Sequence, residues 1–106
     1  MEEKSTKDRF AKYLPLGTVV LLRGATKKIM ITGYYSADVN KTDKVYDYSG
    51  CLYPEGFLSF DQTCLFDHNQ IGKIYHLGYK DEEQEKFMNV LKETVAKLEE
   101  SKKDMN

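Results

Sequence analysis

The sequence predicts an α+β protein in which a small antiparallel β-sheet is followed by one C-terminal amphipathic helix. Between residues 18 and 79, short runs rich in Val, Ile, Tyr and Phe alternate with turn segments containing Gly, Pro, Asn and Asp. This alternation is typical of strands. From Asp81 onward, apolar residues recur at a helical spacing instead. With 106 residues, the chain has room for one domain with one modest core.

The first two predicted strands form a hairpin. Residues 18–22 (TVVLL) and 28–35 (KIMITGYY) are joined by a short turn that contains Gly24. Neither strand alternates cleanly between apolar and polar residues, which indicates that both of its faces are covered. This pattern fits either a sheet backed by a helix or an SH3-like barrel, in each case with about five strands.

Three more strands are expected after a polar loop at residues 36–43. Their predicted ranges are 44–49, 57–60 and 73–79. In the third strand, Tyr46 and Tyr48 share one face because side chains alternate along a strand. Residues 67–71 predict a single helical turn before the last strand, with Asp67 as its cap.

The C-terminal helix is predicted from its cap and its apolar stripe. Asp81 and Gln84 have the spacing of a capping box, in which each residue bonds the backbone N–H of the other. The stripe consists of Phe87, Met88, Val90, Leu91, Val95 and Leu98. We expect it to pack on the sheet of the same domain, while Phe87 and Val90 widen it enough to offer a face to a partner helix.

These elements predict three parts of one domain. Residues 1–12 are expected to be a flexible or partly helical leader, 13–80 a β-sheet domain and 81–104 the helix that packs on it. The first nine residues contain no apolar segment of the signal-peptide type, and the longest apolar run, residues 19–22, is too short to span a bilayer. We therefore expect a cytoplasmic protein that does not insert into a membrane.

The charge balance does not favour a nucleic-acid partner. Sixteen basic and seventeen acidic residues give a formal net charge of −1. The alternative of a small nucleic-acid-binding barrel rests on tyrosines that would stack on bases and lysines that would meet phosphates. The tyrosines are Tyr34, Tyr35, Tyr46 and Tyr48, and the lysines are Lys27, Lys28, Lys41 and Lys44. Tyrosines that simply pack the sheet are the simpler interpretation.

No pattern predicts an enzyme, a cofactor or a metal ion. Cys64, Asp67 and His68, with His76 further on, are too loosely spaced for a zinc site with four ligands. The chain also lacks a nucleophile elbow and a glycine-rich phosphate loop. Cys51 and Cys64 are expected to be reduced and partly buried.

Three segments resemble a known family. They are residues 13–22 (YLPLGTVVLL), residues 46–50 with 53–56 (YDYSG and YPEG), and residues 76–79 (HLGY), which lead into an acidic helix. In this order and spacing they are similar to a small Gram-positive bacterial family named domain of unknown function 4176. The resemblance covers residues 13–98, and YPEG is its most specific mark.

The resemblance implies a cytosolic accessory protein encoded beside type VII secretion loci and their LXG toxins. Such a protein would be a chaperone or targeting adaptor for a secreted LXG-type effector, with small helical secretion proteins as further partners. A toxin-neutralising or regulatory protein of the same locus is the alternative. The residues expected to contact the partner are Tyr46, Tyr48, Tyr53, Pro54 and Phe57. Exposed aromatic residues in turns favour this choice, because large apolar side chains at a surface commonly mark an interface.

Overall fold

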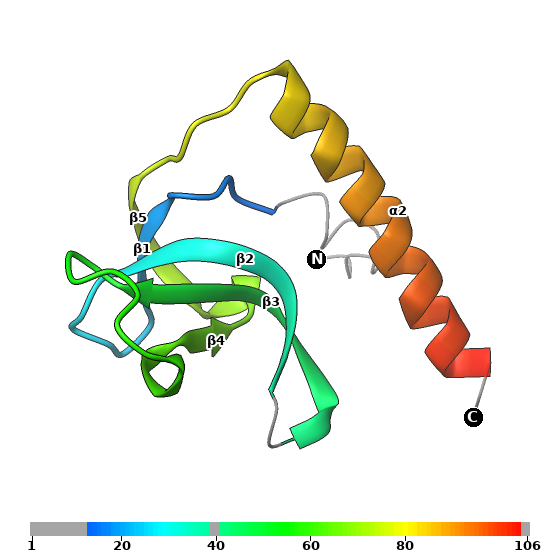
Figure 1. Ribbon diagram of the computed structural model, residues 1–106, viewed down its shortest axis with the longest axis horizontal. Helices are drawn as coiled ribbons and strands as arrows, with labels where there is room; N and C mark the ends of the chain where they lie inside the picture. The colour runs from blue at the N-terminus through cyan, green and yellow to red at the C-terminus, as the bar shows by residue number, and fades with distance from the viewer. Residues whose placement is uncertain (1–12, 39–40, 105–106) are drawn as a thin grey trace, which may run out of the picture. The chain divides into compact units, whose positions relative to one another are not determined.

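Five antiparallel strands are followed by one long helix in a computed structural model that describes residues 13–38 and 41–104 (Figure 1). The elements are β1 (Val19–Leu22), β2 (Ile29–Asp38), β3 (Lys41–Leu52), η1 (Phe60–Gln62), β4 (Cys64–Phe66), η2 (His68–Gln70), β5 (Ile71–His76) and α2 (Glu82–Asp104). The sheet order β4-β3-β2-β1-β5 places β4 and β5 at its two edges, so the sheet is open. The predicted α+β class, with a five-stranded antiparallel sheet and a C-terminal helix, is confirmed.

The chain divides into two compact units. Residues 14–79 form the sheet unit, and Tyr13 belongs with residues 80–104 in the helical unit. The predicted leader at residues 1–12 lies outside the described residues. That the helix packs on the sheet stays a prediction.

Strands β2 and β3 pair with each other and extend further than the predicted ranges 28–35 and 44–49. Ser36 pairs with Tyr46 and Ala37 pairs with Val45, so the ladder continues into the segment predicted as a polar loop. The prediction of a loop from residue 36 was wrong. Ladder hydrogen bonds join backbone groups, so a strand can continue where its side chains are polar. Residues 39–40, within that segment, lie outside the described residues.

The predicted fourth strand at residues 57–60 is also wrong. Phe57, Leu58 and Phe60 lie in an exposed connection, and the strand that pairs with β3 is Cys64–Phe66. The apolar run FLSF satisfied the compositional rule for a strand, but it has no neighbouring strand to bond. Its side chains are consequently left at the surface.

The core of the sheet unit is built from both faces of its central strands. Val19 and Val20 are neighbours on β1 and both are buried, so both faces of this strand are covered, as predicted. Ile31, Tyr48 and Phe66 are fully buried, and the Tyr48 and Phe66 rings stack with centroids 5.3 Å apart. Each large apolar side chain buried in this way contributes about 1.5–3 kcal/mol to stability.

A close approach of two segments joins the start and the end of the sheet. Gly17 adopts φ +87°, a conformation that favours glycine, and its N–H donates to the carbonyl of Ile31. Gly78 lies against the backbone of Leu16, and its N–H donates to Oγ1 of buried Thr18 at 3.0 Å. Two of the segments that carry the family resemblance therefore meet here.

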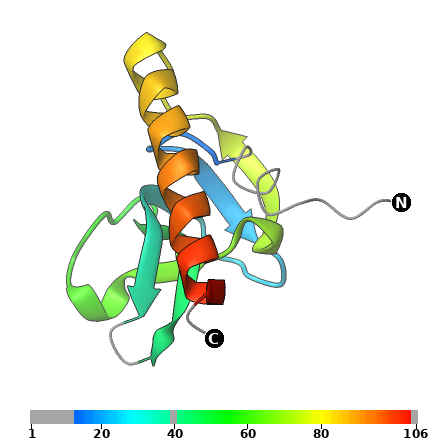
Figure 2. The same cartoon turned by 90° about the vertical axis from the view of Figure 1, so that its right-hand side faces the viewer.

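Helix α2 runs unbroken over its 23 residues (Figure 2). Oδ1 of Asp81 accepts a hydrogen bond from the backbone N–H of Gln84 at 2.8 Å, which is half of the predicted capping box. Met88 and Val95, two turns apart, are buried, whereas Phe87 and Val90 are exposed. The predicted apolar stripe is therefore divided into a covered part and an exposed part.

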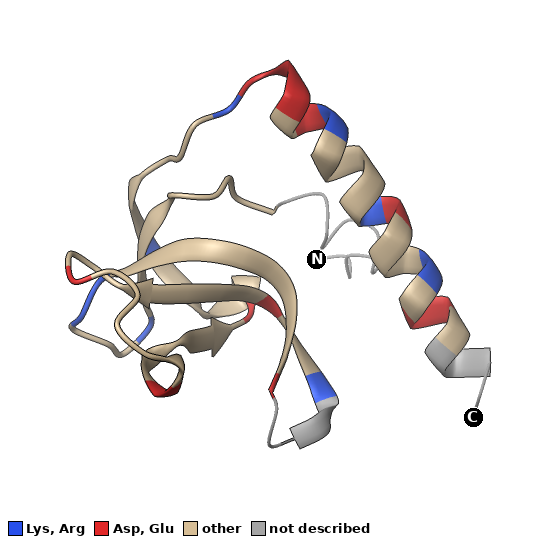
Figure 3. Cartoon of the chain, in the orientation of Figure 1, with Lys and Arg blue, Asp and Glu red and all other residues tan. Residues whose placement is uncertain are grey.

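Helix α2 is strongly charged. Basic and acidic residues alternate along it, as the colours of the ribbon in Figure 3 show. Among the described residues, no helix combines the length and the apolar character that a membrane crossing would need.

Candidate functional site

A groove on the sheet unit is the leading candidate for a functional site. It has a volume of about 650 Å³ and is formed by β2, β3, η1 and β4. Its walls include Ser36, Asp38, Tyr46, Phe60, Asp61 and Leu65. We call it the aromatic groove. Tyr46 is the predicted contact residue that lines it directly.

The rim of the aromatic groove carries aromatic rings that the core does not use. The ring of Phe60 is 88% exposed and meets the ring of Phe57 edge to face, with centroids 5.4 Å apart. Phe57 and Leu58 are each 60% exposed. Contiguous apolar side chains at a surface favour contact with a partner, because covering them removes apolar area from water.

Tyr46 links the groove to an ion pair between Lys44 on β3 and Asp67, the residue before η2. The ammonium group of Lys44 lies 4.7 Å from the centroid of the Tyr46 ring and 3.4 Å from Oδ2 of Asp67. A cation on an aromatic face stabilises the position of both side chains. The ring is thus held at the groove.

Tyr48, another predicted contact residue, lies in the core with no exposed surface. Its hydroxyl oxygen accepts a hydrogen bond from the N–H of Leu14 at 3.0 Å and lies 2.7 Å from Nδ1 of His68. The hydroxyl group and the imidazole ring therefore share a hydrogen bond. Burial raises the pKa of Tyr48 above its ordinary value. Tyr48 holds the fold together and is not part of the candidate surface.

Asp47 and Asp67 complete a polar network around Tyr48. Oδ2 of Asp47 accepts from the N–H of His68 at 2.8 Å, and Oδ1 of Asp67 accepts from the N–H of Asp47 at 3.0 Å. Asp47 is itself buried, so the hydrogen bond from the N–H of His68 supplies a partner that its buried carboxylate requires. The predicted helical turn after Asp67 is confirmed as η2, and this network fastens it to β3.

Tyr53 and Pro54 lie in the turn that follows β3. The N–H of Tyr53 donates to the carbonyl of Lys28 at 3.0 Å, and the Tyr53–Pro54 peptide bond is cis. Glu55 forms an ion pair with Lys27 at 2.8 Å, which further fixes the turn. Tyr53 is 43% exposed, but it lies seven residues beyond Tyr46, about 23 Å at the usual rise per residue of a strand.

The five predicted contact residues therefore do not form one cluster. Tyr46 lies at the aromatic groove, Phe57 joins its rim through Phe60, Tyr53 and Pro54 lie in the turn, and Tyr48 is in the core. The sequence did not predict Phe60, Leu58 and Leu65 as contact residues. The run FLSF at residues 57–60 did contain a signal for Phe60 and Leu58, because bulky residues that follow Gly56 would also suit an exposed connection.

The cysteine and histidine side chains do not gather into a reactive site. Cys51 is buried and Cys64 is partly exposed, and both are free thiols, as expected. Burial, with a smaller contribution from Cys51, raises the pKa of the Cys64 thiol and disfavours its thiolate. Among residues 13–38 and 41–104, no group of three His, Cys, Asp or Glu side chains is placed to hold a metal ion.

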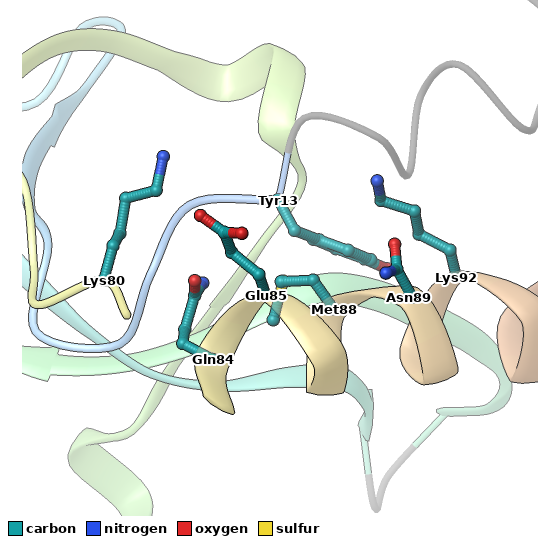
Figure 4. A pocket seen from close by; sticks show the side chains of 7 residues that line it. All are labelled: Tyr13, Lys80, Gln84, Glu85, Met88, Asn89 and Lys92. Carbon is teal, nitrogen blue, oxygen red and sulfur yellow. The ribbon is translucent and has the colours of Figure 1, made fainter. Parts of the chain in front are cut away.

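The helical unit contains a second hollow, of about 320 Å³ (Figure 4). Tyr13 and Met88, both buried, form its apolar part. Lys80, Glu85 and Lys92 line the remainder, so its charges are of both signs. Because its aromatic side chain, Tyr13, is buried, we assign the candidate site to the aromatic groove, whose aromatic rim is exposed.

Comparison with known proteins gives a family. No curated protein and no solved structure matches the chain. A family described as "Domain of unknown function (DUF4176)" matches residues 13–87, which include the whole sheet unit and the first turns of α2. Because this match covers most of the chain and includes the segments YPEG and HLGY, the protein belongs to the DUF4176 family.

Proposed function

We propose that this protein is a non-enzymatic accessory factor that binds another protein in the aromatic groove. The observation that carries the proposal is the exposed pair Phe57 and Phe60 beside a groove that contains Tyr46. Aromatic side chains dominate the energetics of protein interfaces, and truncating a central one commonly weakens binding by about 2 kcal/mol or more. The family resemblance adds the client: an LXG-type effector of type VII secretion, held in the cytoplasm before export by a chaperone or targeting adaptor.

The composition of the groove favours one kind of client segment. Tyr46, Phe60 and Leu65 supply apolar walls, while Asp38 and Asp61 supply negative charge. An amphipathic helix with apolar anchors and flanking Lys or Arg side chains would match both features. The exposed Phe87, Val90 and Leu98 of α2 would suit a second helical protein, such as the small helical partners of the secretion system.

Nucleic acid is a weaker candidate. Base stacking needs an open aromatic face, and lysine ammonium groups already lie on the rings of Tyr46 and Tyr75. Tyr48, which this alternative needs at the surface, is in the core, and the hydroxyl of Tyr34 donates to the carbonyl of Leu14. These positions favour a protein partner.

Co-expression with the LXG toxin encoded beside the gene tests the proposal. We expect one stable complex on gel filtration, and we expect Phe57→Ser with Phe60→Ser to abolish it. Both side chains are exposed, so the thermal unfolding of the doubly substituted protein should stay close to that of the wild type. Tyr79→Ser, which removes an exposed aromatic side chain outside the groove, is the matched control.

Two outcomes would count against the proposal. Separate migration of the wild-type protein and the toxin would show that the toxin is not the client. A complex unaffected by the groove substitutions would show that the client does not bind in the aromatic groove. Truncated toxins separate the remaining roles. An adaptor should bind the LXG domain, whereas a toxin-neutralising protein should bind the toxin domain and protect the cells that express it.

A further inference from the structure

Strand β5 is an edge of the sheet with its side chains at the surface. It pairs with β1 along one side, and the sheet order ends at β5 (Figure 1). Five of its six residues are exposed and the sixth is partly exposed. The aromatic groove is formed by β2, β3 and β4 with η1, so β1 separates β5 from it.

Apolar side chains continue along this edge. Ile74 and Tyr75 are each 45% exposed, and Leu77, just after the strand, is 51% exposed. Natural proteins usually shorten, cover or charge an edge strand, because its outer backbone groups are able to pair with another chain. β4, at the other edge, has only three residues, whereas β5 has six.

The edge is also positively charged. The ammonium groups of Lys28 and Lys73 lie 4.8 Å and 4.7 Å from the centroid of the Tyr75 ring. Neither lysine forms an ion pair with another residue of the described chain. Two like charges near one ring repel each other, so an anionic group close to both ammonium groups would be stabilised.

A neighbouring hollow is also lined by positively charged side chains. It has a volume of about 370 Å³ and lies at the start of β5, where Arg23, His68 and Lys73 line it. Nε of Arg23 donates to the carbonyl of Asn69 at 3.2 Å, which holds the guanidinium group beside β5. Neither β1 nor β5 contains an acidic residue.

We propose that β5 binds an extended acidic segment of a second protein, which adds to the sheet as a sixth strand. Its backbone would pair with β5, its apolar side chains would cover Ile74, and its carboxylates would meet Arg23, Lys28 and Lys73 beside the Tyr75 ring. A second copy of this chain fits less well, because the lysines of the two copies would face each other.

This inference deepens the proposed function and rests on it for the role of an adaptor. A protein that holds its client in the aromatic groove and a second protein at β5 is an adaptor, since it joins two partners. Strand addition at β5 can nevertheless be tested alone, without the client.

The test uses two peptides with blocked ends, one of alternating Glu and Val and one of alternating Lys and Val, added to the full chain. We expect the Glu peptide to shift the amide NMR signals of residues 71–76, and the Lys peptide to leave them unchanged. The double substitution Lys28→Ala and Lys73→Ala should lower the affinity for the Glu peptide about five- to ten-fold, because each exposed ion pair contributes only modestly to binding. Lys97→Ala, an exposed lysine on α2, should have no effect.

Three results would overturn the inference: no shift at residues 71–76, equal binding of both peptides, or a dimer of the free protein paired through β5. If the groove variants lose the client and the Glu peptide causes no shift at residues 71–76, the sixth strand is refuted and the proposed function stands. If the Glu peptide binds at β5 but no client complex forms, the proposed function is refuted and strand addition stands.

Discussion

The hydroxyl of Tyr48 shows how one atom joins three parts of the sheet unit. It bonds the N–H of Leu14 before β1 and the imidazole of His68 in η2, while its own ring lies on β3. Tyr34 acts on the same segment, since its hydroxyl donates to the carbonyl of Leu14. Leu14 is therefore held at both of its backbone polar groups by tyrosines.

Substitution of Tyr48 by Phe tests this role. The ring stays in place, but the N–H of Leu14 and Nδ1 of His68 lose their partner, so we expect the free energy of unfolding to fall by about 1–3 kcal/mol. Tyr46→Phe is the control, because the hydroxyl of Tyr46 has no hydrogen-bond partner among the described residues. Urea unfolding measures both variants, and equal losses would contradict the assignment.

The same tyrosines predict how stability depends on alkaline pH. Burial raises the pKa of Tyr34 to about 12 and that of Tyr48 further, whereas both titrate near 10 in an unfolded chain. The unfolded state therefore loses these protons first, and stability that is complete below about pH 10 declines as the pH rises towards 12. Urea unfolding across this range should show a smaller decline for Tyr34→Phe. A decline identical to that of the wild type would argue against a buried hydroxyl.

At the scale of the elements, the junction of Gly78 with Leu16 fixes the end of the sheet. A Cβ on Gly78 would overlap the carbonyl group of Leu16 and come within 3.0 Å of the N–H nitrogen of Thr18. Both obstacles are backbone atoms, which cannot move aside without shifting β1. Residue 78, in the segment HLGY, must therefore be glycine, because no side chain fits between the two segments.

Gly78→Ala should accordingly destabilise the protein, by about 1–3 kcal/mol or more, the usual range for overpacking. Gly72→Ala is the matched control on β5, because its Cβ would meet the flexible Cγ of Arg23 at 3.3 Å. We expect the control to change stability by less than about 1 kcal/mol. Thermal unfolding compares the two, and an equal or larger loss for Gly72→Ala would contradict the role of the junction.

The elements predicted correctly from sequence are those with a local signature. The hairpin of β1 and β2 has two β-branched runs around a glycine turn, and α2 has a cap and a helical period. The error at residues 57–60 has a physical cause. A short apolar run becomes a strand only if another strand lies beside it, and that pairing depends on the tertiary fold.

The candidate site was predictable only in part for the same reason. Tyr46 and Tyr48 have the same chemistry and lie two residues apart, yet one lines the aromatic groove and the other is in the core. The difference comes from Phe66 and His68, whose rings lie against Tyr48. No local pattern around residue 48 contains that information.

At the scale of the whole molecule, the sheet unit offers two surfaces of opposite character. The aromatic groove contains Asp38 and Asp61, and the edge at β5 is surrounded by Arg23, Lys28 and Lys73. The groove is formed by β2, β3 and β4 with η1, so β1 lies between the two surfaces. Two partners of opposite charge would therefore bind without competing, which is what an adaptor requires.

The most direct test of the central claim is photocrosslinking from the aromatic groove. A photoreactive phenylalanine analogue is placed at position 60, or at the exposed Thr26 as a control, and the protein is co-expressed with the LXG toxin. Our account predicts a crosslinked product from position 60 and none from position 26. Absence of a product from position 60, in a complex that still forms, would show that the client binds elsewhere and would contradict the account.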